Sequence, residues 1–263
     1  FRRVLFRSPQ TLWFSNAGAF SNMNVSTPTK DSDAITRTLV GQQVNEIRHL
    51  APVGTSMMIL TSGAEWRCWP GPNSSALTPA ACFTLPQTSH GSSHVPPVYT
   101  ENTLLIFQEK GSNVRGLTYD ALQDIYTSKD MSVLASHLLV DVGGSYQITE
   151  RAFAEVPFKI IWCVRSDGAL LGLTYMREHD VTAWHRHTTN GLVESVCTIT
   201  EPDGYGGYED ALIEFHHGAR HAHHNAGEDQ QRHAFADAAL GNLLAHPHDQ
   251  DGTGSQRQHG GYD

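Results

Sequence analysis

Three copies of one local pattern constrain the fold of this chain more than any other feature. Each copy joins a short apolar run, a glycine-containing turn and a second run rich in β-branched and aromatic residues. The copies occupy residues 57–69, 103–119 and 159–175. Two such runs around a short turn are typical of a β-hairpin. The turn at Asp167-Gly168 is the strongest, because glycine accepts the positive φ that tight hairpin turns require. The pattern predicts an all-β fold.

The spacing of the hairpins indicates how they pack. They begin at residues 57, 103 and 159, so the intervals are 46 and 56 residues. Repeats of about 40–50 residues with a hairpin in each are typical of propeller blades. A small sheet leaves apolar surface exposed, whereas face-to-face packing around an axis covers both faces. We predict a partial β-propeller-like array of hairpin blades. An irregular β-sandwich whose hairpins repeat by chance is the alternative.

Two weaker signals add elements to this array. Residues 129–132 supply capping chemistry and residues 133–138 place apolar side chains at helical spacing, which predicts one short helical insertion between the second and third blades. A further strand pair is predicted at residues 182–187 and 193–199. The Asn190-Gly191 turn would join these two strands.

Both ends of the chain differ from its centre. Residues 1–8 match the translated end of a common sequencing adapter, so we expect them not to be native and exclude them. Residues 216–263 hold nine of the sixteen histidines and show no sustained apolar periodicity. A frameshifted tail, a disordered native tail and a metal-binding tract are the three interpretations of this segment. Residues 9–215 are then expected to form the folded, β-propeller-like domain.

Charge argues against one class of partner. The formal net charge is −9, and it becomes −12 (−9 − 3) when Arg2, Arg3 and Arg7 are left out. A chain that binds a phosphate backbone needs clustered Lys and Arg. Sequence-specific nucleic-acid binding is therefore not expected. The longest apolar runs fall well short of the ~20 residues that span a bilayer, so no membrane partner is expected either.

The four cysteines show no CxxC spacing and no short disulfide framework. Cys68 and Cys163 lie inside apolar, strand-like runs, where a free cysteine behaves as a small buried hydrophobe. This use of cysteine suits assembly in a reducing compartment.

One histidine pair is the best metal candidate. His185 and His187 alternate along a predicted strand, so they point to the same face and could share a metal. Sequence offers no third ligand nearby, and Trp184 and Arg186 would occupy the other face. We therefore favour a solvated or interface pair and assign no metal site.

No catalytic constellation emerges. Asp31, Asp33, Glu178 and Asp180 could supply a glycosidase pair, but solvated loop acids are the simpler interpretation. Ser166-Asp167-Gly168 lacks the spacing and tryptophan of a sialidase Asp-box, and no Walker, GxGxxG, GxSxG or HExxH motif is present. We expect no enzyme activity, no catalytic residue and no cofactor.

The tryptophans could form a stacking platform for a sugar or for single-stranded nucleic acid. Most of them have apolar neighbours, which favours core packing. They are Trp13, Trp66, Trp69, Trp162 and Trp184.

Many short segments, taken in order, resemble one protein family. Residues 12–15 with Gly18, Phe20 and Asn22, followed by residues 31–35, resemble the entry motif of the phage tail nozzle proteins, also called tail tubular protein B. Six later segments are similar to phage and prophage members of the family: 44–50, 60–66, 76–79, 130–138, 172–175 and 183–187. The likeness covers roughly residues 10–200. It departs at Ala19, where an acidic residue is usual, and at Met23, where an aromatic is usual. Beyond about residue 210 it stops.

The resemblance implies a structural virion protein of a phage tail. It implies a ring of six copies (a hexamer) below the portal and adaptor, contacts with tail adaptor and tail fibre proteins, and transient passage of viral DNA through a conduit for ejection. Assembly would take place in the bacterial host cytoplasm. The net negative charge is compatible with a role as a DNA conduit, because a negatively charged lumen repels DNA. We expect residues 15–35 and 119–132 to be loops that contact neighbouring subunits or the lumen.

Two functions of other classes remain as alternatives. A propeller-fold protein that binds or degrades glycans, associated with the tail, would require a pocket with converging acids and exposed aromatics. A receptor-binding tail module is the third possibility.

Overall fold

The structure, a computed structural model, describes residues 8–41, 45–141, 144–188 and 191–216, all within the chain's unit Phe1–Gly218. The fold is all-β, as predicted, and the described residues form antiparallel sheets, one short helical insertion and a separate 3₁₀ turn, η2 (Arg177–His179). The predicted adapter segment, apart from Ser8, and the histidine-rich tail beyond His216 lie outside the described residues.

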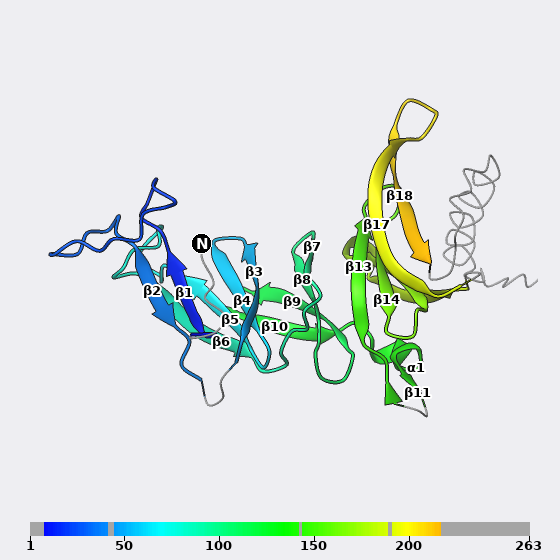
Figure 1. Ribbon diagram of the computed structural model, residues 1–263, viewed down its shortest axis with the longest axis horizontal. Helices are drawn as coiled ribbons and strands as arrows, with labels where there is room; N and C mark the ends of the chain where they lie inside the picture. The colour runs from blue at the N-terminus through cyan, green and yellow to red at the C-terminus, as the bar shows by residue number, and fades with distance from the viewer. Residues whose placement is uncertain (1–7, 42–44, 142–143, 189–190, 217–263) are drawn as a thin grey trace, which may run out of the picture. The chain divides into compact units, whose positions relative to one another are not determined.

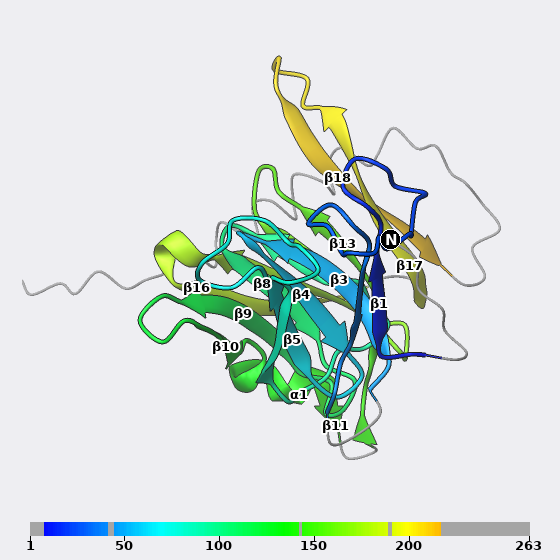
Figure 2. The same cartoon turned by 90° about the vertical axis from the view of Figure 1, so that its left-hand side faces the viewer.

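Three four-stranded antiparallel sheets follow one another along the chain (Figures 1 and 2). Sheet I contains β3 (Ile47–Val53), β4 (Ser56–Thr61), β5 (Glu65–Trp69) and β6 (Phe83–Thr88). Sheet II contains β7 (Val98–Thr100), β8 (Thr103–Phe107), β9 (Val114–Asp120) and β10 (Ile125–Asp130). Sheet III contains β13 (Ile148–Ala154), β14 (Ile160–Arg165), β15 (Leu170–Met176) and β16 (Val181–His187). In each sheet the strands lie in sequence order, and the predicted hairpin supplies the two central strands.

Burial explains why the sequence signal marked the central strands. All five residues of β8 are buried, because both faces of the strand are covered. An apolar run of this length is therefore visible in the sequence. The outer strands carry a weaker signal: β6 is largely exposed and contains Pro86, and β10 reads Ile-Tyr-Thr-Ser-Lys-Asp. Proline is tolerated on such an edge strand because no ladder hydrogen bond is lost there.

Neighbouring sheets share apolar clusters. Leu104 of β8 packs with Met58 and Leu60 of sheet I, whereas the adjacent Leu105 packs with Ile161 and Leu173 of sheet III. Successive side chains on a strand point to opposite faces. Sheet II is therefore buried on both faces, between the apolar side chains of the two other sheets.

Three two-stranded sheets complete the described chain. They are β1 (Thr11–Phe14) with β2 (Ile35–Thr38), β11 (Val140–Asp141) with β12 (Gly144–Ser145), and β17 (Val193–Pro202) with β18 (Tyr208–His216). Leu12 and Ile35 pack the first of these sheets against sheet I, beside Ile59. Val193 and Val196 carry the last onto sheet III. In this way each end of the described domain is covered by a hairpin.

The predicted strand pair 182–187 with 193–199 is wrong. Both segments are strands, but β16 pairs with β15 and β17 pairs with β18. The reason lies in the pattern of burial: Trp184 stands opposite Leu173 and packs on the apolar cluster between sheets II and III, so β16 belongs to sheet III. The Asn190 half of the predicted turn lies outside the described residues.

The predicted helical insertion is present but shorter than expected. A 3₁₀ turn at Val133–Ala135 (η1) runs into α1 (Ser136–Leu139), between sheets II and III. Lys129 and Asp130 belong instead to β10, where they pair with β9. Asp130 forms a local turn instead of a cap, because its Oδ1 accepts hydrogen bonds from the Ser132 backbone N–H (2.8 Å) and hydroxyl (2.7 Å), and Ser132 makes no side-chain capping bond.

Candidate functional site

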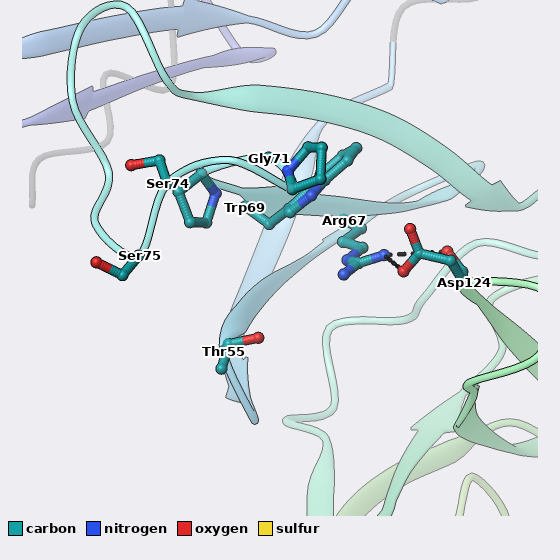
Figure 3. A pocket seen from close by; sticks show the side chains of 9 residues that line it. Thr55, Arg67, Trp69, Gly71, Ser74, Ser75 and Asp124 are labelled. Atoms are coloured by element: carbon teal, nitrogen blue, oxygen red, sulfur yellow. Dashed lines mark hydrogen bonds and ion pairs between the residues drawn. The ribbon is translucent and has the colours of Figure 1, made fainter.

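A cleft of about 380 Å³ lies beside the C-terminal end of β5 (Figure 3). Arg67 and Trp69 of β5 contribute side chains from sheet I, the loop of residues 70–75 forms one wall, and Asp124 reaches in from the β9–β10 turn of sheet II. Two sheets and one loop thus contribute to a single site, which we call the Arg67 cleft.

Arg67 organises the cleft. Its guanidinium lies 4.6 Å from the centroid of the Trp69 ring, a cation–π distance. It donates hydrogen bonds to the Asp124 Oδ1 (2.7 Å), to the Asp124 carbonyl (3.0 Å) and to the Ser56 Oγ (3.0 Å). Because Arg67 is buried, these partners satisfy a charge that would otherwise be costly to desolvate.

Asp124 is held as a carboxylate. The Tyr119 hydroxyl donates to its Oδ1 at 2.6 Å, and the neighbouring Arg67 adds a positive charge. The hydrogen bonds from Tyr119 and Arg67 and the charge of Arg67 hold the pKa of Asp124 below its ordinary value. The same contact raises the pKa of Tyr119. The cleft thus presents an aromatic ring beside a fixed Arg–carboxylate pair.

The cleft combines an aromatic ring, a guanidinium and a carboxylate. Among the described residues that line it, Asp124 is the sole carboxylate. A ring face that meets polar groups is a common setting for recognition of a sugar or another ring. Trp69 is among the tryptophans that the sequence offers as a stacking platform, but the pairing of Arg67 with Asp124, 57 residues apart, has no local sequence signal.

His185 and His187 share one face of β16, as predicted, but both are half-buried rather than solvated. The His185 Nδ1 lies 2.6 Å from the His187 Nε2, and both rings make T-shaped contacts with the Trp162 ring. Burial and the neighbouring His187 lower the pKa of His185 to about 4, and burial lowers the pKa of His187. Trp184 lies on the opposite face, as predicted, where its Nε1 donates to the Met131 carbonyl. Within the described ranges, no three metal-ligating side chains are grouped.

The four candidate acids have separate local tasks. Asp33 is buried and accepts hydrogen bonds from Ser26 N, Ser26 Oγ and Lys30 N, at 2.8–2.9 Å. These backbone hydrogen bonds lower its pKa. Glu178 lies 3.8 Å from the Lys159 Nζ, and Asp180 ends a 3₁₀ turn with a positive φ. Asp31 is exposed. Asp33 thus orders its loop.

The tryptophans mostly pack into apolar clusters, as favoured. Trp66 and Trp162 are buried, and Trp184 packs on the cluster between sheets II and III. Trp13 and Trp69 are half-buried. Of these two, Trp69 lines the Arg67 cleft.

The structure brings together two cysteines that the sequence spacing did not pair. The Cys68 and Cys82 sulfurs lie 3.8 Å apart in the core of sheet I, and both residues are buried. Cys163 is buried, as predicted for a small hydrophobe, and Cys197 is exposed. Proximity of this kind arises only when β5 and the segment before β6 pack together.

The predicted contact loops expose large apolar side chains. The segment between β1 and β2 is a loop, residues 15–34, in which Phe20 is 86% exposed. Residues 119–132 are less of a loop than expected, because β10 occupies much of this range. The turn between β9 and β10 nevertheless presents Leu122, at 99% exposure, and Leu134 of η1 is also exposed.

None of the helices in the described ranges is both long and apolar enough to cross a membrane.

The chain was compared with protein-family models and with curated proteins, and neither comparison finds a match.

Proposed function

We propose that this chain is part of a structural virion protein of a phage tail, a nozzle or tail tubular component of the DNA ejection conduit. The ordered likeness of residues 10–200 to that family supports the assignment. That likeness carries the assignment. Phe20 and Leu122 project from separate loops into solvent, and we propose them as residues at which subunits meet.

The order of the sheets supports a propeller-like body. Sheets I, II and III follow one another in the chain, and each shares an apolar cluster with the next. We propose that they are consecutive blades, packed face to face around a common axis. A body of this kind acts through its shape. Its loops would contact other copies in a ring, six of them as the family resemblance implies, and would contact tail adaptor or fibre proteins.

Self-association tests the assembly role. The double variant Phe20→Ser/Leu122→Ser should shift the chain from ring-sized oligomers toward monomer in native mass spectrometry, with an unchanged circular dichroism spectrum. Tyr205→Ser is the matched control, because Tyr205 is 90% exposed but lies in the β17–β18 turn, outside both loops. A wild-type chain that stays monomeric at every concentration would contradict the proposal.

Neighbouring genes test the phage assignment. The DNA on both sides of this reading frame should encode portal, adaptor and internal virion proteins. Genes for carbohydrate metabolism on both sides would overturn the assignment.

A glycan-binding protein associated with the tail is the second candidate, and the Arg67 cleft is the observation that favours it. Trp69 offers a ring face beside the Arg67–Asp124 pair. A glycan array probed with the wild-type chain and with Trp69→Ala distinguishes the candidates. If the wild-type chain binds a glycan and Trp69→Ala does not, the glycan-binding function is favoured. If neither chain binds, the structural role is favoured.

A further inference from the structure

We propose that Cys68 and Cys82 are a redox-modification site, a dithiol that small disulfides convert to an intrachain disulfide. The inference is independent of the proposed function, since it rests on the geometry of sheet I. It adds a chemical modification that controls the loop between the two cysteines.

The geometry of β5 and β6 brings the sulfurs together. Cys68 lies on β5 opposite Thr84 of β6, and Cys82 precedes Thr84 by two residues. The two cysteines are therefore diagonal neighbours on one face of the sheet. Their sulfurs, 3.8 Å apart, must approach to about 2.05 Å to form a bond. Cys82 stands before the first residue of β6, so it can move without breaking the strand ladder.

The surroundings favour reaction at Cys82. Arg37 places its guanidinium beside this thiol while it also donates a hydrogen bond to the Pro79 carbonyl at 2.8 Å. The contact with Cys68 and the neighbouring Arg37 lower the pKa of Cys82. We assign Cys82 as the nucleophile because it lies before the ladder of β6 and beside the Arg37 guanidinium, and Cys68, held within β5, as the resolving thiol.

The chemistry balances in two exchange steps. The Cys82 thiolate attacks one sulfur of glutathione disulfide, which forms a mixed disulfide and releases one glutathione thiolate. The Cys68 thiol then loses its proton and attacks the Cys82 sulfur, which releases the second glutathione. Two protein thiols are oxidised to one disulfide, and one glutathione disulfide is reduced to two thiols. Both cysteines are buried, so the loop of residues 70–81 must open for the reagent to enter.

The bond would change the Arg67 cleft. The loop between the cysteines supplies Pro70, Gly71, Pro72, Ser74 and Ser75 to the wall of the cleft. A disulfide between these two cysteines, which are fourteen positions apart, would restrict the conformations of this loop in the folded protein and those of the unfolded chain. The oxidised protein should therefore unfold at a higher temperature and resist proteolysis in the loop.

Peptide mass mapping of the full chain tests the inference directly. Both cysteines fall in one tryptic peptide, residues 68–110, bounded by Arg67 and Lys110. The chain is incubated with glutathione disulfide and alkylated, first in the folded state and again after denaturation. The peptide should then be lighter by two hydrogens and carry no alkyl group. If dithiothreitol is added before alkylation, the same peptide should carry two alkyl groups. Cys163 and Cys197 lie in other peptides and serve as internal references.

Cysteine variants distinguish oxidation of the Cys68–Cys82 pair from non-specific oxidation of other thiols. Cys82→Ser should abolish the mass loss, and Cys163→Ser should preserve it. Because a core variant can fail to fold, the wild-type mapping decides by itself. A folded chain whose 68–110 peptide keeps two free thiols after prolonged oxidation, or links mainly to Cys197, would overturn the proposal.

Discussion

At the residue scale, Gly172 shows how one missing side chain positions another. A Cβ at this position would lie 2.1 Å from the His185 Cε1, so the histidine ring occupies the space that glycine leaves on β15. Gly172→Ala should destabilise the fold by about 1–3 kcal/mol, the usual range for overpacking. Urea unfolding measures the loss. In the His185→Ala background the same change should be much milder, and an equal penalty in both backgrounds would assign the effect to the backbone instead.

The half-buried histidine pair predicts a pH dependence. The folded-state pKa of His185 is about 4, and the value in an unfolded chain is about 6.5. Between these values the unfolded state binds more protons, so stability is full above about pH 6.5 and falls as the pH decreases toward 4. His187 acts in the same direction. The carboxylates Asp33 and Asp124, whose pKa values are lowered, lose their contribution at still lower pH.

The thermal midpoint at pH 7 and pH 5 measures this dependence. His185→Asn should reduce the difference between the two midpoints, because it removes the group that the fold keeps neutral. A variant with the wild-type difference would show that other groups control stability in this window.

At the element scale, β8 separates two interfaces that can be weakened one at a time. Leu104 and Leu105 are both almost fully buried, but they belong to the clusters toward sheet I and sheet III respectively. Either change to alanine should cost about 2–5 kcal/mol. Amide hydrogen exchange should show the difference: Leu104→Ala should lower protection in β4, and Leu105→Ala should lower it in β14. Equal loss of protection in both strands for both variants would mean that the sheets unfold as one unit.

The central hairpins could be predicted because their signals are local. Each combines two buried runs with a turn residue such as Gly168, whose φ is +80°. The outer strands could not be predicted in this way. β6 and β10 carry mixed polar sequences that become strands because a central strand offers them a hydrogen-bonding edge. The same tertiary influence assigned residues 182–187 to sheet III rather than to a hairpin with 193–199.

At the scale of the whole molecule, net charge should influence assembly. Copies with a formal charge of −9 repel one another, and salt screens that repulsion. Under the proposed structural role, self-association through the loops that hold Phe20 and Leu122 should be tighter at about 0.3 M NaCl than at about 0.02 M, where the Debye length is several-fold longer. Sedimentation velocity at the two salt concentrations measures the change. Weaker association at high salt would indicate that ion pairs, rather than apolar loops, join the copies.

The sequence by itself determined the all-β class, the three central hairpins, the short helical segment after β10 and the burial of Cys163, because these depend on neighbours within a few residues and on apolar periodicity. Only the tertiary structure decided the contact of Arg67 with Asp124 and that of Cys68 with Cys82. The first joins residues 57 apart on two sheets, and the second depends on the register of β5 against β6. No local pattern encodes such distances, because they are set by how separate strands pair and pack.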